Sequence, residues 1–225
     1  MFYDLGGQFS PEILVNFERK KQILKLQNKE HPAFGKGFTD DLLRFLNFSI
    51  DIPTDIFFSK AHSWVQKNEI GLVKIGVDDF LYKTVGEFQL TNFADIKKEI
   101  NKGDTIFEIS VNKKLIKIFS PIDGKVKSIN QKIVNKTLSN PYTEWGVLLE
   151  PNNYKNDIKE FTKNNDTVLW MKEELSKFKK FLNDNLNKSK LVGPTMYDGG
   201  LVVNGVISYL PDSEIKEFEN QFLKL

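Results

Sequence analysis

The chain has 225 residues, enough for one compact domain with long arms or for two small domains. Its 32 basic and 30 acidic residues leave a net charge of +2, which gives no broad basic field for nucleic acid. The absence of cysteine excludes disulfides, thiolate nucleophiles and cysteine-ligated metal or iron–sulfur sites. No apolar run approaches the ~20 residues of a membrane-spanning helix, and the first residues lack the features of a signal peptide. We therefore expect a cytoplasmic protein that binds neither nucleic acid nor membrane.

The first 52 residues predict a helical N-terminal arm. Ser10 and Pro11 combine an N-cap residue with proline at the first helical position, and apolar residues then follow helical spacing to about Gln27. A second, shorter helix is expected after Thr39, which is a good N-cap residue. We assign residues 1–52 to this arm.

From Pro53 the pattern changes to short β-rich runs separated by glycine and aspartate turns. Strands at this spacing favour a small antiparallel sandwich or barrel. A turn or a short helix is expected between the fourth and the fifth run. The predicted strands are residues 57–58, 64–65, 72–76, 85–90, 105–111, 115–119 and 125–129, with the turn or helix over 92–101.

The chain becomes helical again in a C-terminal extension assigned to residues 162–225. A stripe of apolar residues at steps of three and four predicts an amphipathic helix to about Asn187. A closing helix is expected over residues 211–225, with three apolar side chains facing inward. The stripe consists of Val168, Met171, Leu175, Phe178 and Leu182, and the inward-facing residues of the closing helix are Ile215, Phe218 and Phe222.

The segment over residues 105–126 is the most informative about function. Two β-rich runs flank a short polar turn, and a Ser-Pro-x-x-Gly sequence then leads into a third run. The turn residues are Asn112, Lys113, Ser120, Pro121 and Gly124. This arrangement resembles the hairpin on which lipoyl and biotinyl carrier domains present their modified lysine, since the attached group must reach separate active sites. The alternative is an ordinary hairpin with a solvated turn lysine.

Residues 53 to about 161 resemble the glycine cleavage system H protein family. The resemblance rests on the order and spacing of several segments: Ala-His-Ser-Trp-Val at 61–65, the run at 71–80, Val-Gly-Glu at 85–87, Lys-Gly-Asp at 102–104, Ser-Pro-Ile-Asp-Gly-Lys-Val at 120–126 and Asn-Pro-Tyr at 140–142. It implies a fold that is mainly β with flanking helices (α+β), a barrel-sandwich hybrid of the lipoyl-domain type over residues 53–161. The helical additions at both ends are similar to those of divergent H-protein-like proteins.

The same resemblance assigns residue roles. It places Lys113 at the position of the lipoyl-lysine, with Gly103 at its expected spacing before the hairpin. His62, Trp64, Pro141 and Tyr142 are implied to be structural positions of the family motif, and we expect His62 to bond to backbone. The flanks of Lys113 depart from the family, in which an acid precedes the lysine by three residues and small residues follow it. Here these positions are Ser110, Lys114 and Leu115.

The resemblance implies a carrier with lipoate covalently bound to Lys113 and no catalytic residue of its own. Such a protein shuttles an aminomethyl or other lipoyl-bound group between partner enzymes. The implied partners are a glycine decarboxylase, an aminomethyltransferase, a dihydrolipoamide dehydrogenase and a lipoate ligase. The alternative function is a non-lipoylated H-like binding or scaffold module. An uncovered Lys113 at the hairpin tip favours the carrier, and a C-terminal segment lying over it favours the scaffold.

No other pattern in the chain predicts chemistry. No serine, histidine and aspartate form a nucleophile with its base, and with two histidines a zinc site would need carboxylates at a spacing that is not present. Asp78, Asp79 and Glu87 are interpreted as turn and strand-edge acids. We therefore expect no catalytic residue and no metal site.

Overall fold

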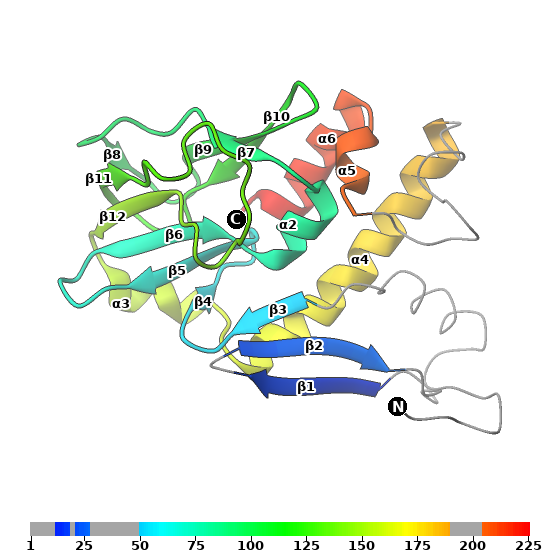
Figure 1. Cartoon of the computed structure of the whole chain (residues 1–225), viewed down its shortest axis with the longest axis horizontal. Helices are drawn as coiled ribbons and strands as arrows, with labels where there is room; N and C mark the ends of the chain where they lie inside the picture. Colours follow the sequence, from blue (N-terminus) through cyan, green and yellow to red (C-terminus); the bar gives the residue numbers. More distant parts are fainter. Residues whose placement is uncertain (1–11, 19–20, 28–49, 190–203) are drawn as a thin grey trace. The chain divides into compact units, whose positions relative to one another are not determined.

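The computed structural model describes residues 12–18, 21–27, 50–189 and 204–225 (Figure 1). The chain divides into two compact units. One unit contains residues 1–52 and 171–203, and the other contains residues 53–170 together with 204–225. The unit with the predicted β domain therefore also includes the C-terminal residues.

The N-terminal region contains strands where a helix was predicted. Strand β1 (Glu12–Glu18) pairs antiparallel with β2 (Lys21–Gln27), and β3 (Ile50–Pro53) completes a sheet in the order β1-β2-β3. The helix expected over residues 10–27 is therefore wrong. Ile13, Val15 and Phe17 also alternate with period two, and β-branched residues favour strands. The helix expected after Thr39 lies outside the described residues.

The larger unit is built on two antiparallel sheets. Phe107, on a strand of the smaller sheet, packs against Gly146 beside the larger one, where an added Cβ would lie 2.7 Å from the ring. The six-stranded sheet has the order β4-β5-β6-β12-β11-β8, with β4 (Phe57–Phe58), β5 (Ser63–Lys67), β6 (Val73–Val77), β12 (Val147–Pro151), β11 (Gly124–Ile129) and β8 (Glu99–Ile100). The three-stranded sheet has the order β10-β9-β7, with β10 (Lys114–Phe119), β9 (Thr105–Val111) and β7 (Gln89–Thr91).

The strands predicted over residues 57–129 are confirmed except at one place. The run predicted at 85–90 begins inside a helix, α2 (Asp79–Val85), and only its end belongs to β7. Asp78 starts this helix by accepting a hydrogen bond from the Leu81 N–H at 2.9 Å. Gly86 ends it with a φ of 88°. Strands β8 and β12 were not predicted.

Most of the described helices follow the last strand in the sequence. The predicted apolar stripe of the long helix and the three predicted inward-facing residues of the closing helix are all buried, which confirms both patterns. The closing helix ends in a π-helical turn. The elements are α3 (Tyr154–Asp157), the 3₁₀ turn η1 (Ile158–Glu160), α4 (Asn165–Ser189), α5 (Val206–Tyr209), α6 (Asp212–Phe218) and the π turn η2 (Glu219–Leu223).

The core of the larger unit includes the end of the chain. Phe218 and Phe222 are 0% and 1% exposed, and their rings stack with centroids 5.1 Å apart. Phe222 also stacks on Phe80 of α2, at 6.0 Å. The predicted class, mainly β with flanking helices, is therefore confirmed, and residues 204–225 complete the core. None of the described helices is long and apolar enough to cross a membrane.

Candidate functional site

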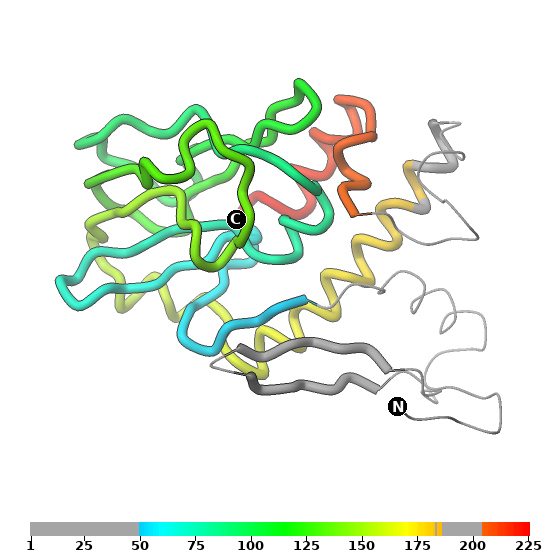
Figure 2. The backbone as a smooth tube through the Cα atoms, viewed as in Figure 1, coloured from blue at the N-terminus to red at the C-terminus, as the bar shows by residue number. Residues whose placement is uncertain are grey.

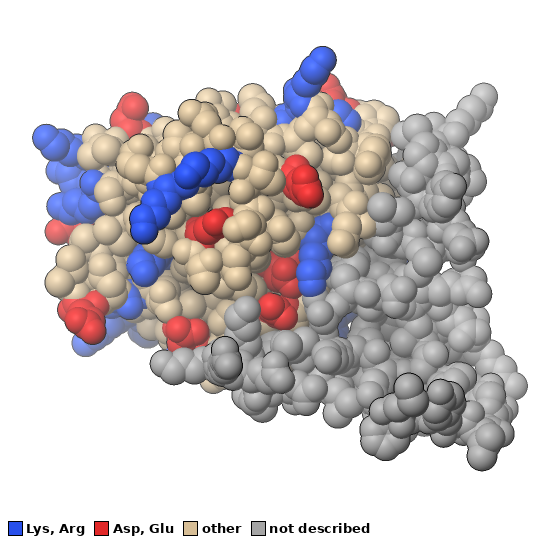
Figure 3. Space-filling model, in the orientation of Figure 1, with Lys and Arg blue, Asp and Glu red and all other residues tan. Residues whose placement is uncertain are grey.

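Asn112 and Lys113 form a two-residue turn that joins β9 to β10. Val111 and Lys114 face each other across the strands as the pair next to the turn. Both turn residues have positive φ, 47° at Asn112 and 65° at Lys113, as in the type I′ turn that fits the twist of a hairpin. Lys113 is exposed, and basic and acidic side chains are interspersed on the face of the molecule shown in Figure 3. The structure therefore places Lys113 at the tip of its hairpin.

The base of the hairpin is held by hydrogen bonds among the other predicted turn residues. The Gly103 N–H donates to the Ser120 carbonyl at 2.9 Å, and Gly103 has a φ of 89°. The Ser120 N–H donates to the Asp104 carbonyl, and its hydroxyl donates to the Ile122 carbonyl at 2.7 Å. Pro121 is buried beside them. These bonds fix the two ends of the hairpin to each other.

Gly124 serves this region through close packing and not through a left-handed backbone. Its φ is not among the positive values. A Cβ at Gly124 would lie 2.1 Å from the Leu149 Cδ2 and 2.3 Å from the Glu150 carbonyl oxygen. Gly124 is therefore required where β11 crosses close to β12.

Residues 204–225, here called the C-terminal segment, lie beside the hairpin (Figure 2). The Lys114 ammonium donates to the Ser208 carbonyl at 3.1 Å and to the Leu210 carbonyl. The Lys117 N–H on the outer edge of β10 donates to the Glu219 carboxylate at 2.6 Å. The C-terminal segment thus contacts the hairpin along β10 and leaves Lys113 exposed.

The start of the C-terminal segment packs against the end of α2, where Gly205 and Gly86 approach each other closely. The Gly205 N–H donates to the Lys83 carbonyl at 2.8 Å. A Cβ at Gly86 would lie 2.8 Å from the Gly205 Cα, and both glycines have positive φ. A side chain at either position would therefore be strained.

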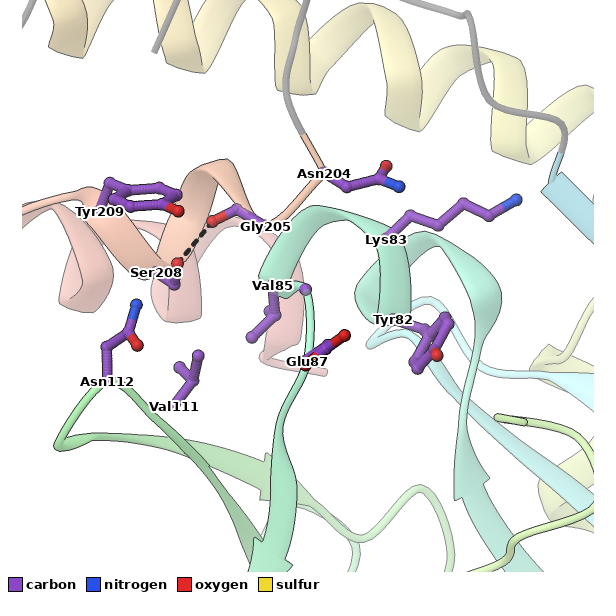
Figure 4. Close-up of a pocket in the computed structure, with 11 residues that line it drawn as sticks. Tyr82, Lys83, Val85, Glu87, Val111, Asn112, Asn204, Gly205, Ser208 and Tyr209 are labelled. Carbon is purple, nitrogen blue, oxygen red and sulfur yellow. Dashed lines mark hydrogen bonds between the residues drawn. The ribbon is translucent and has the colours of Figure 1, made fainter. Parts of the chain in front are cut away.

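A cavity of about 470 Å³ lies between α2, the hairpin turn and α5 (Figure 4). Its wall is mostly polar, and Asn112 faces the Ser208–Tyr209 side of the opening. The lining residues are Tyr82, Lys83, Val85, Gly86, Glu87, Val111, Asn112, Asn204, Gly205, Ser208 and Tyr209. Burial and the nearby carboxylates of Asp79, Glu87 and Glu144 raise the pKa of Tyr82.

His62 lies in the core, where its partner differs from the one predicted. Its Nδ1 lies 2.7 Å from the Asp78 carboxylate, and both side chains are fully buried. Its ring stacks on Phe80 at 4.0 Å between centroids. The expected side-chain bond to backbone is therefore wrong, because the carboxylate that caps α2 is also the partner of the imidazole.

Trp64, Pro141 and Tyr142 connect a loop to the larger sheet. The Trp64 indole N–H donates to the carbonyls of Val77, at 2.8 Å, and Pro141, at 2.9 Å. The Tyr142 hydroxyl accepts from the Asp79 N–H at 3.1 Å. None of these three residues lines the cavity, which is consistent with structural roles.

Of the other acids that the sequence singled out, Glu87 is exposed and lines the cavity, and Asp79 makes a local contact. Asp79 forms an ion pair with Lys83 at 3.0 Å, one turn along α2. Within the part of the chain that the structure describes, no group of three or more histidine and carboxylate side chains is placed to bind a metal. The contacts of Lys114 could not be predicted from the sequence, because their acceptors are backbone carbonyls far along the chain.

Comparison with protein families matches residues 56–174, more than half of the chain, to the family described as "Glycine cleavage H-protein". A "Probable glycine cleavage system H protein" of Pyrococcus abyssi is 28% identical over 112 residues, which cover 48% of this chain and 84% of that protein. A glycine cleavage system H protein of Oceanobacillus iheyensis is 28% identical over 110 residues, covering 47% of this chain and 86% of the relative.

Among solved structures, a glycine cleavage system H protein from Mycobacterium marinum aligns with a TM-score of 0.42 and 18% identity. The alignment covers 45% of this chain and 87% of that one. The family match over residues 56–174 identifies the fold as the barrel-sandwich hybrid of the lipoyl-domain type. The C-terminal segment lies outside the matched residues, although it belongs to the same compact unit.

Proposed function

We propose, from the premise that this chain belongs to the glycine cleavage H-protein family, that it is a lipoyl carrier with its lipoyl group on Lys113. Proteins of this family are non-catalytic carriers with lipoate bound covalently to a lysine. Carrier function needs no catalytic constellation in the chain, only an accessible amine on a stable support. The proposal includes the cytoplasmic location expected from the sequence.

The observation that carries this proposal is the exposed Lys113 at a two-residue hairpin turn. Attachment forms an amide between the lipoyl carboxyl and the Lys113 Nζ, so the amine must enter the active site of a ligase or transferase. A hairpin tip allows this approach because the strands on either side recede from it. The bonds among Gly103, Asp104 and Ser120 keep the base of the hairpin fixed while the tip stays accessible.

When bound, the lipoyl group supplies a dithiolane that carries the transferred unit, and the protein presents it. We propose that this unit is an aminomethyl group or another lipoyl-bound group. The proposed partners are a glycine decarboxylase, an aminomethyltransferase, a dihydrolipoamide dehydrogenase and a lipoate ligase.

A second candidate function, a scaffold that is never lipoylated, is favoured by two observations at the same hairpin. Ser110 stands at the position where the resemblance implies an acid. The C-terminal segment is also bonded to β10 at Lys114 and Lys117, which leaves less of the hairpin open to a partner.

The two functions are separated by the intact mass after co-expression with a lipoate ligase and lipoate. The carrier proposal predicts a gain of one lipoyl group that is lost in Lys113→Arg, a variant that keeps the charge but cannot form the amide. Lys117→Arg changes an exposed lysine on the strand that follows the turn; it is the matched control and should remain modified. An unmodified protein, beside an H protein that is modified in the same cells, would contradict the carrier and support the scaffold.

A further inference from the structure

Two adjacent lysines at the hairpin have opposite environments. Lys113 is exposed at the turn, whereas Lys114 begins β10 and is partly buried. The strand pairing places Lys114 opposite Val111, which is 6% exposed and lines the cavity. The side chain of Lys114 therefore extends toward the C-terminal segment and not toward solvent.

The Lys114 ammonium is hydrogen-bonded to two backbone carbonyls. It donates to the carbonyls of Ser208 and Leu210, at the end of α5. Charge-assisted bonds of this kind are stronger than neutral ones and restrain the side chain. An amine whose protons are engaged in this way is a poor acceptor for an acyl group, because the bonds must open before the nitrogen can react.

The C-terminal segment that supplies these carbonyls is itself held at several points. Gly205 is bonded to α2, Glu219 is bonded to the edge of β10, and Phe222 packs in the core. The two carbonyls are therefore fixed relative to the hairpin before any acyl group arrives.

We propose that Lys114 is a positioning residue that clamps the hairpin to the C-terminal segment and leaves Lys113 as the single acceptor amine of the turn. This inference rests on the proposed function only for the identity of the acyl group. The protection of Lys114 is a property of the unmodified protein and is measured without any ligase.

The direct test is limited acylation of the folded protein with a succinimidyl ester, followed by peptide mapping. Lys113 and Lys117 should react at similar rates, and Lys114 should react about tenfold or more slowly, since opening a charge-assisted bond costs about 1.4 kcal/mol or more. Lys117 is the internal control, because its side chain is exposed on the same strand. Equal reaction of Lys113 and Lys114 would overturn the proposal.

A pair of variants in the C-terminal segment tests the cause of this protection. Gly205→Val should displace α5, because its Cβ would lie 3.2 Å from the Gly86 Cα and its φ is 82°. Lys114 should then react like Lys117. Tyr209→Ala is the matched control, because it trims a side chain that is 53% exposed and keeps both carbonyls, so Lys114 should stay protected. Continued protection in a folded Gly205→Val protein would contradict the clamp.

The ligase gives a separate readout of selectivity. With wild type modified at Lys113, the lipoyl group should be lost in Lys113→Arg and should not move to Lys114. Lys114→Arg should keep the modification at Lys113, because arginine can donate to the same carbonyls. Transfer of the lipoyl group to Lys114 would refute the clamp. If the protein is never lipoylated but Lys114 is still protected from the succinimidyl ester, only the carrier function is refuted.

Discussion

Lys113 adopts a backbone conformation that its side chain does not favour. Its φ of 65° lies in the left-handed region, which costs a non-glycine residue about 1–2 kcal/mol. Type I′ turns prefer asparagine followed by glycine, and the chain has the asparagine but places a lysine second. A lysine at this position does not serve stability, which is consistent with a role for its amine.

Lys113→Gly should therefore stabilise the protein, by about 0.5–1 kcal/mol, because glycine accepts a positive φ without strain. Lys113→Ala should stay within about 0.5 kcal/mol of wild type, because the exposed side chain makes little stabilising contact. Urea unfolding of the three proteins gives both differences. A clear loss of stability in Lys113→Gly would show that the lysine side chain supports the fold.

Gly124→Ala should destabilise the larger unit by about 1–3 kcal/mol, because the added methyl overlaps Leu149 and the Glu150 carbonyl. The next residue provides the control: Lys125→Ala changes a partly exposed side chain and should cost about 0.5 kcal/mol or less. Thermal unfolding of both variants makes the comparison. Equal midpoints would mean that β11 and β12 do not approach closely at Gly124.

At the scale of elements, patterns formed by neighbours in the sequence were predictable, and elements that depend on distant partners were not. The β9–β10 hairpin follows from two β-rich runs around a polar pair, and α4 follows from its apolar stripe. The segment over residues 12–18 fits both the helical and the strand period, and only its pairing with β2 decides between them. The same limit explains why β12, which pairs with β6 and β11, was missed.

In the candidate site too, the parts formed by neighbours in the sequence were predictable and the part formed by distant residues was not. The tip and base of the hairpin could be predicted from the order of Lys113, Ser120, Pro121 and Gly124. Its side wall could not, because the carbonyls of Ser208 and Leu210 come from residues about ninety positions later and carry no side-chain signal.

The loop over residues 139–144 should make a pH-dependent contribution to stability through Glu144. Burial alone would raise the pKa of Glu144, but hydrogen bonds from the Ser139 N–H and hydroxyl and the Asn140 N–H outweigh it, so the pKa is lowered. The carboxylate therefore contributes stability that is complete above the ordinary glutamate pKa and is lost as pH falls through the lowered value.

Glu144→Gln should accordingly lower the thermal midpoint at neutral pH, and the difference from wild type should shrink as the solution is made acidic. Glu150→Gln, at an exposed position, is the comparison variant and should show a smaller effect at neutral pH. A Glu144→Gln effect that is constant with pH would mean that the charge of Glu144 does not hold the loop.

At the scale of the molecule, the C-terminal segment belongs to the folded body that carries the hairpin. Phe218 and Phe222 contribute to the same core as Phe80 of α2. The segment also bonds the open edge of β10 through Glu219, an edge that would otherwise present free backbone groups. The family-matched residues 56–174 and the C-terminal segment should therefore unfold together.

Phe222→Ala should destabilise this body by about 3–5 kcal/mol, the usual cost of a large buried aromatic. Tyr209→Ala, in the same segment but exposed, should cost far less. Denaturant unfolding monitored by tryptophan fluorescence compares them. A Phe222→Ala protein as stable as wild type would show that the C-terminal segment is not part of the core.

Peptide mass spectrometry of the protein purified from its native cells shows whether Lys113 carries a lipoyl group. We expect a lipoyl-modified peptide in which fragmentation assigns the group to Lys113, with Lys114 unmodified. An unmodified hairpin peptide, in cells whose other lipoyl proteins are fully loaded, would contradict the carrier function.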